Sequence, residues 1–193
     1  MTLRTFLSLL VLAPAALHAG PGQDEAQARL RSAVDEVLNI AKNAKDRAGL
    51  VSKIGPVLSK HISFDVMTRR AIGPGWRTFT PAQQKDAVKH FTQLIIRSYS
   101  SKFTIGAMPE ISYKSAATPA AGRVDVTTTT TYQGSRYNVI YRMEQAEGWR
   151  TTDVVIEGVS MVANYRSQFD PVFKKGGAEA VLRSLEQSAA RPQ

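Results

Sequence analysis

The sequence contains no cysteine among its 193 residues. Disulfide bridges, thiolate metal ligands, cysteine nucleophiles and a lipidated N-terminal cysteine are therefore excluded from this chain. Small secreted domains often depend on disulfides, so a stable fold must come from the apolar core alone.

Histidine is also scarce, at three residues, and none of them lies in a recognisable nucleophile motif. No group of His, Asp and Glu has the spacing of metal ligands. A glycine-rich phosphate loop is absent as well, because Gly73–Gly75 follows a predicted helix rather than a strand. The sequence thus indicates no catalytic residue, no metal and no cofactor.

No apolar run reaches the length of about 20 residues that crosses a bilayer. The first residues, MTLRTFLSLLVLAPAALHAG, combine Arg4, a short apolar run and small residues ending at Ala19. This is the layout of a secretory signal peptide. We predict a signal peptide over 1–19, although Leu17 leaves the cleavage position open. The remainder is then an exported, soluble periplasmic protein without a lipid anchor.

The formal net charge is +9, and the basic residues are spread along the chain. Arg69-Arg70 and Lys174-Lys175 are the only basic doublets, and no basic stripe is interleaved with aromatic residues. No nucleic-acid partner is therefore expected, whereas anionic membrane surfaces are compatible with this charge.

Helical periodicity dominates the chain as far as residue 103. The strongest start signal is TPAQ at 80–83, where Thr80 and Gln83 form a capping box around Pro81. Gly55-Pro56 is expected to interrupt an earlier helix.

The period changes to two beyond Ile111. Two alternating runs flank Gly134-Ser135, which we predict as a two-residue hairpin turn. Alternation then places one apolar set on a single face: Val126, Thr128, Thr130, Tyr132, Tyr137, Val139, Tyr141 and Met143. The other face is polar, with Asp125, Arg142 and Glu144. A third strand follows over 149–157, with its faces left unassigned.

The last segment predicts a helix from Ser160 and a second one separated from it by Gly176-Gly177, with a kink at Asp170-Pro171. We predict an α+β fold in which these C-terminal helices pack on the apolar face of an antiparallel sheet. No repeat or long linker divides residues 20–193, which we predict as one domain, with a small helical subdomain as an alternative.

Three kinds of function fit these elements. Threonines opposite aromatic residues leave room for a ligand if the helices stand off the sheet, or else form an ordinary filled core. An isomerase with a cavity carboxylate, Asp125 or Asp153, is a second possibility, although Asp125 falls on the polar face. A structural adaptor with a filled core is the third.

Three stretches then carry a resemblance: DVVIEGVSMVANYRSQF (153–169), FDVMTRRAIGPGWRTFTPAQQ (64–84) and HFTQLIIRSYSSKF (90–103). Their order and spacing resemble the MlaC family, also called toluene-tolerance auxiliary proteins. Gly55-Pro56 and Asp170-Pro171 depart from the family pattern.

The resemblance implies an NTF2-like sheet wrapped by N- and C-terminal helices around an apolar pocket. It implies a monomeric phospholipid carrier that holds acyl chains and shuttles lipid across the periplasm, in support of outer-membrane lipid asymmetry. The implied partners are an outer-membrane lipoprotein–porin complex and an inner-membrane ABC transporter with an MCE-domain protein. A hopanoid-like lipid is the alternative cargo.

Face counting and the resemblance together predict a lipid-binding wall. Its members are Met67, Ile72, Trp76, Phe91, Ile95, Tyr99, Phe103, Val126, Thr128, Val139, Tyr141, Met143, Met161, Val162, Tyr165 and Phe169. Arg166 is a candidate for headgroup contact, with an ordinary surface ion pair as the alternative.

Overall fold

A computed structural model of the protein describes residues 21–100 and 108–190. Helices come first, a sheet follows and a long helix ends the described chain, which confirms the predicted α+β class. The elements are α1 (Pro21–Lys42), α2 (Arg47–His61), α3 (Phe64–Ile72), the 3-10 helix η1 (Gly73–Thr78), α4 (Pro81–Ser100), β1 (Glu110–Ala120), β2 (Arg123–Tyr132), β3 (Ser135–Ala146), β4 (Gly148–Ile156), β5 (Val159–Ser160) and α5 (Met161–Ala190).

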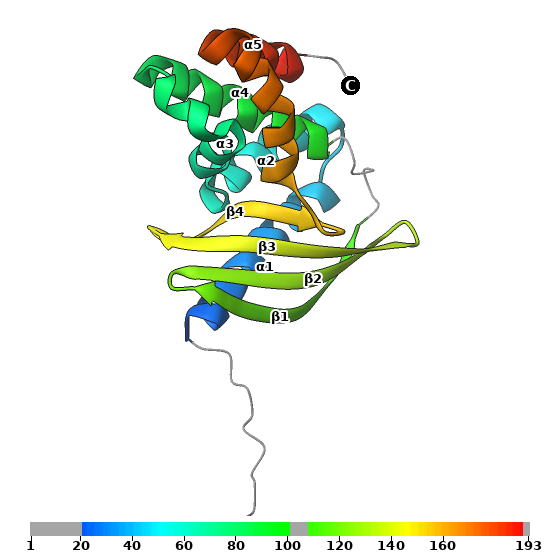
Figure 1. Ribbon diagram of the computed structural model, residues 1–193. Helices are drawn as coiled ribbons and strands as arrows, with labels where there is room; N and C mark the ends of the chain where they lie inside the picture. Colours follow the sequence, from blue (N-terminus) through cyan, green and yellow to red (C-terminus); the bar gives the residue numbers. More distant parts are fainter. Residues whose placement is uncertain (1–20, 101–107, 191–193) are drawn as a thin grey trace, which may run out of the picture.

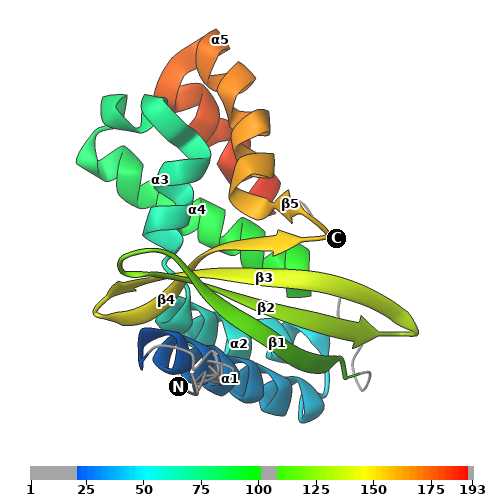
Figure 2. The same cartoon turned by 60° about the horizontal axis from the view of Figure 1, so that its bottom comes forward.

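The five strands form an open antiparallel sheet in the order β1-β2-β3-β4-β5. Helix α1 crosses one face of the sheet, and α3, α4 and α5 stand beyond the β4 edge (Figure 1). Seen from below, α1 and α2 lie on one side of the strands and α3–α5 on the other (Figure 2). The helices therefore form two groups rather than one layer.

The hairpin between β2 and β3 corrects the predicted turn. The two turn residues are Gln133 and Gly134, both with positive φ (49° and 78°), and Tyr132 pairs with Ser135. Positive φ at both central residues is characteristic of a type I′ turn, whose twist matches that of the paired strands. The predicted register was wrong by two residues, but a two-residue shift keeps every side chain on its predicted face.

The covering of the apolar face also differs from the expectation. Helix α1, rather than the C-terminal helices, lies over it: Ala26 and Leu30 form one buried cluster with Val124, Val126, Met143 and Trp149. We call this group the sheet cluster. The N-terminal helix supplies the nearest apolar stripe, so the C-terminal helices pack with α3 and α4 instead.

The second core, which we call the helical cluster, joins α3, α4 and α5. Its buried members are Phe64, Met67, Ala71, Ile72, Phe79, Ala87, Phe91, Ile95, Met161, Val162, Phe169, Val181 and Leu185. The predicted capping box is present at the start of α4: the backbone N–H of Thr80 donates to Gln83 Oε1 (2.9 Å), and the Gln83 N–H donates to Thr80 Oγ1 (3.3 Å).

The predicted interruption of α2 is wrong, and the predicted break within α5 is confirmed. Helix α2 continues through Pro56, and the first half of α5 continues through Pro171. The predicted break at Gly176-Gly177 is confirmed, since both residues have non-helical backbone angles and Gly177 has a φ of 61°. Tertiary packing therefore tolerates the lost proline hydrogen bonds, whereas the glycine pair ends the first half of α5.

Gly75 lies at a close approach between η1 and α5. A Cβ built on Gly75 would lie 2.7 Å from the ring of Phe173, which packs against the helical cluster. We expect Gly75→Ala to lower the free energy of unfolding by about 2 kcal/mol, because the ring must shift within packed surroundings. Urea unfolding followed by circular dichroism measures this change.

Gly55→Ala is the matched control. Apart from its neighbours in the chain, a Cβ at Gly55, inside α2, would meet Ile96 Cδ1 at an ordinary 3.8 Å. Alanine restricts the unfolded chain and favours the helix, but the Pro56 ring disfavours helical backbone for a preceding residue with a Cβ, so a change within about 0.5 kcal/mol is expected. Equal effects of the two substitutions would contradict a special role for Gly75.

His61 gives the fold a predictable pH dependence. It is 4% exposed at the end of α2, its Nε2 lies 3.4 Å from Glu36 Oε2, and its Nδ1 has no hydrogen-bond partner among the described residues. Burial lowers the pKa of His61 below its ordinary 6.5, against the opposing effect of Glu36. As the pH falls, the unfolded chain therefore binds a proton at His61 before the folded chain does. The stability that is fully present above pH 6.5 is lost as the pH falls towards the pKa of the folded state.

We expect the free energy of unfolding of the wild type to fall between about pH 7.5 and about pH 5, a range that brackets the titration of histidine. The decrease should be smaller for His61→Gln, because glutamine does not titrate. Urea titrations across this range measure the two slopes. A variant with the same slope as the wild type would show that other groups cause the dependence.

Candidate functional site

The predicted wall residues of the helices lie together. Met67, Ile72, Phe91, Ile95, Met161, Val162 and Phe169 are all buried in the helical cluster, with Trp76, Tyr99 and Tyr165 at its edge. Phe91 is at the centre: its ring meets Tyr165 edge-on at 5.2 Å and Phe169 at 6.3 Å between centroids. These geometries are favourable for aromatic pairs and fix the ring positions.

The predicted wall residues of the sheet lie in the other group. Val126 and Met143 are buried in the sheet cluster, and Tyr141 packs at its edge. Thr128 and Val139 pair across β2 and β3 on the same face and are also buried, and the Thr128 hydroxyl donates to the Val139 carbonyl (3.2 Å). Phe103 lies outside the described residues.

The two clusters meet on one face of the sheet. Tyr141 on β3 and Val154 on β4 are cross-strand partners, so their side chains are neighbours on that face. Tyr141 packs against the sheet cluster, whereas Val154 packs against the helical cluster. This pair therefore links the predicted sheet wall with the predicted helical wall, and we call the place where the two clusters meet, around Tyr141 and Val154, the apolar boundary.

Tyrosines surround this boundary. Tyr99, Tyr113, Tyr141 and Tyr165 are half-buried, and burial raises the pKa of each. The effect is largest at Tyr141, whose pKa burial raises to about 12. Tyr141 nevertheless keeps part of its surface accessible to solvent, and the Tyr113 hydroxyl is buried with no hydrogen-bond partner in the part of the chain that the structure describes. Half-buried phenol rings of this kind present an apolar body and one polar atom.

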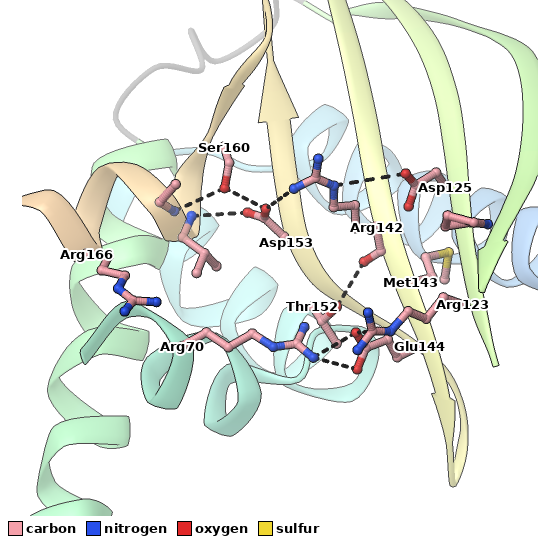
Figure 3. Close-up of a pocket in the computed structure, with 13 residues that line it drawn as sticks. Arg70, Arg123, Asp125, Arg142, Met143, Glu144, Thr152, Asp153, Ser160 and Arg166 are labelled. Atoms are coloured by element: carbon pink, nitrogen blue, oxygen red, sulfur yellow. Dashed lines mark hydrogen bonds and ion pairs between the residues drawn. The ribbon is translucent and has the colours of Figure 1, made fainter. Parts of the chain in front are cut away.

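A cavity of about 480 Å³ opens on the opposite, polar face of the sheet. Its lining comes from seven elements: Arg70, Pro119, Arg123, Asp125, Arg142, Met143, Glu144, Thr152, Asp153, Ser160, Val162, Ala163 and Arg166. Figure 3 shows two rows of charged side chains in it, one from Asp153 through Arg142 to Asp125 and one from Arg70 through Glu144 to Arg123. Arg166 stands on the α5 side.

Sequence reasoning singled out Arg166, Asp125 and Asp153 in this cavity and missed Arg70 and Arg123. Alternation along the strands places Arg123, Asp125, Arg142 and Glu144 on one face, so this part carried a signal. Arg70 enters from α3, far away in sequence, and nothing local indicates its approach to Glu144 at 2.8 Å.

Asp153 is held as a structural anchor. Its Oδ2 accepts hydrogen bonds from Ser160 Oγ (2.6 Å) and Arg142 Nη1 (3.1 Å), and its Oδ1 accepts from the Val162 N–H (3.1 Å). The carboxylate thereby caps the first turn of α5, where a negative charge is stabilised. An isomerase base needs a carboxylate lone pair aimed at substrate, and here three donors already occupy this group.

Asp125 is less firmly paired. Its nearest cation is Arg142 Nε at 4.0 Å, and burial raises its pKa despite that positive charge. It lies beside Arg142 rather than in the apolar boundary, which keeps it on the polar face as the sequence predicts.

Among the residues that the structure describes, no helix combines the length and apolar character needed to cross a bilayer. Nor do the described ranges bring together three side chains of the kinds that ligate metals.

Comparison with known proteins places these features in context. Among solved structures, the chain is similar to a phospholipid-binding protein from Ralstonia solanacearum, determined in complex with a phospholipid. The two share 29% identity with a TM-score of 0.78, over 86% of this chain and 97% of that protein. No curated protein gives a significant match. A family model described as MlaC protein matches residues 31–187, and the chain therefore belongs to the MlaC family.

Proposed function

We propose that this protein is a phospholipid carrier of the periplasm, exported by a signal peptide over 1–19 and folded as one lipid-binding domain over 20–193. The observation that carries the proposal is the similarity, along nearly the whole fold, to a protein solved with a phospholipid bound. Membership of the MlaC family supports the same conclusion.

The acyl chains occupy the apolar boundary between the sheet and helical clusters. Tyr141 supports this position, because its hydroxyl is strongly desolvated while its side chain keeps accessible surface. Tyr99 and Tyr165 add two more half-buried rings from α4 and α5. Such rings line a site that accepts apolar groups and leave a few hydroxyls to orient the ligand.

The cost of moving a lipid through water explains why a binding site alone is enough for this function. Each methylene exposed to water costs about 0.8 kcal/mol, so two acyl chains would cost on the order of 20 kcal/mol in an aqueous gap. A carrier replaces the apolar environment of the membrane and needs no catalytic group, so we propose a carrier and not an enzyme. The headgroup stays near the surface, with Arg166 as its candidate contact.

The carrier exchanges lipid, as a monomer, with an outer-membrane lipoprotein–porin complex and an inner-membrane ABC transporter bearing an MCE-domain protein. This part of the proposal follows from family membership, and it connects the protein with outer-membrane lipid asymmetry. The positive net charge favours approach to anionic membrane surfaces at low salt.

The test is native mass spectrometry and lipid extraction of the protein purified after export, followed by uptake of labelled phospholipid from vesicles. We expect one bound phospholipid and uptake by the delipidated protein. Finding neither bound nor acquired lipid would falsify the carrier. A bound hopanoid-like lipid instead of phospholipid would change the cargo and keep the mechanism.

A further inference from the structure

The polar cavity presents cations to solvent and keeps its carboxylates deeper. The side chains of Arg70, Arg123, Arg142 and Arg166 are between 35% and 55% exposed. Those of Asp153, Glu144 and Asp125 are 8%, 25% and 29% exposed. A ligand that enters the cavity therefore meets guanidinium groups first. This arrangement favours anions and disfavours cations.

The arginines also keep binding capacity that the protein does not use. Glu144 alone serves both Arg70, through one Nη at 2.8 and 2.9 Å, and Arg123, through Nε at 3.3 Å. In the described part of the chain, the ion-pair partner of Arg166 is Asp170, at 4.0 Å. Because a guanidinium carries five N–H donors in a planar fork, each of these side chains has donors left for a second acceptor.

We propose that this cavity binds a phosphate group, with Arg166 on the α5 side and Arg123 on the β2 side as its principal contacts and Arg70 between them (Figure 3). A tetrahedral phosphate offers several acceptor oxygens at once, and arginine pairs with it in a bidentate manner. The cavity, at about 480 Å³, is large enough for a phosphate ester but its charged lining does not suit an acyl chain.

The cavity adjoins the proposed chain site. Val162 lines the cavity and is also a member of the helical cluster, so the two regions meet at the first turn of α5. If the phosphate is that of a lipid headgroup, which rests on the proposed function, the cavity fixes the headgroup on the polar face. The chains then lie at the apolar boundary, which the helical cluster connects with the cavity through Val162. A free phosphate or a small phosphate ester has the same chemistry and needs no chain site.

The experiment compares wild type, Arg166→Gln, Arg123→Gln and the matched control Arg183→Gln. Arg183 is also an exposed arginine of α5, paired with Glu179 at 3.5 Å, and it does not line the cavity. Delipidated full-length mature protein is titrated with inorganic phosphate and with glycerophosphoethanolamine by calorimetry. In parallel, uptake of phosphatidylethanolamine and of uncharged diacylglycerol from vesicles is measured.

We expect phosphate and glycerophosphoethanolamine to bind wild type and Arg183→Gln alike, and Arg166→Gln and Arg123→Gln about tenfold more weakly, from the loss of one charge-assisted contact. An accompanying drop in phosphatidylethanolamine uptake, with diacylglycerol uptake unchanged, identifies the headgroup as the source. Unchanged lipid uptake identifies a free phosphate compound.

Equal binding by all four proteins, or no phosphate binding by the wild type, overturns the site. The proposed carrier function is tested separately, because it is contradicted only if the wild-type protein takes up neither phosphatidylethanolamine nor diacylglycerol. Circular dichroism of each variant confirms that the substituted surface arginines leave the fold intact.

Discussion

Replacing Asp153 with alanine is expected to lower the free energy of unfolding by about 3 kcal/mol, because a buried, fully paired carboxylate is removed. The substitution leaves the Val162 N–H, the Ser160 hydroxyl and Arg142 without their common acceptor. It also removes the negative charge at the start of α5. Urea unfolding, followed by the far-ultraviolet circular dichroism signal, measures the loss.

Asp125→Asn is the control for this prediction. Asp125 lines the same cavity, but it lies 4.0 Å from Arg142 and burial raises its pKa, so its charge adds little to stability. A change within about 0.5 kcal/mol is expected. An unfolding midpoint of Asp153→Ala close to that of Asp125→Asn would refute the anchoring role of Asp153.

Asp153 also shows where sequence reasoning reaches its limit. Its side chain caps a helix that begins eight positions later in the chain, and the pairing of β4 with β3 brings it beside Arg142. The register of β4 includes an irregularity between Arg142 and Met143, which alternation alone does not reveal. The two faces of β4 could therefore be assigned only once the position of this irregularity was known.

Local signals were the most predictable part of the fold. The Thr80–Gln83 capping box and the break at Gly176-Gly177 depend on neighbouring residues only, and both are confirmed. Pro56 failed as a predicted interruption because packing of the surrounding helix outweighs the lost hydrogen bond.

The register of the β2–β3 hairpin was predictable in principle. The turn expected at Gly134-Ser135 would place Asp125 opposite Glu144, a pair of like charges. The observed register instead pairs Asp125 with Arg142 and Arg123 with Glu144. Directly opposed charges of unlike sign stabilise a hairpin, so cross-strand electrostatics selects the observed turn.

The site could be predicted only in part, for a reason of topology. Residue spacing identifies Phe91, Ile95 and Tyr99 as one face of α4, but it does not tell which sheet face or helix they meet. Because α1 covers the sheet, the predicted wall falls into two clusters, which the cross-strand pair Tyr141 and Val154 connects. Long-range packing decides this arrangement.

Removal of the bound lipid is the second change with a large expected effect. A ligand that binds only the folded state stabilises it by about 3 kcal/mol at 100 times its Kd, so the delipidated protein should unfold at a lower urea concentration. Delipidation by reversed-phase extraction and refolding, followed by reloading from vesicles, gives the pair of samples. Reloading must restore the higher midpoint if the loss is due to lipid rather than to damage.

Hydroxyl-radical labelling of the same two samples locates the chains. Radical attack follows the accessibility of a ring rather than its ionisation, so the raised pKa of Tyr141 does not affect the comparison. We expect the lipid to protect Tyr141, Tyr99 and Tyr165, which keep accessible surface in the structure, whereas Tyr137, at 39% exposure, is labelled in both samples. Protection of Tyr141 alone restricts the chains to the sheet cluster, and protection of Tyr99 and Tyr165 alone restricts them to the helical cluster. Unchanged labelling of all three, with lipid demonstrably bound, contradicts the proposed wall, because an acyl chain between the clusters must cover at least one of these rings.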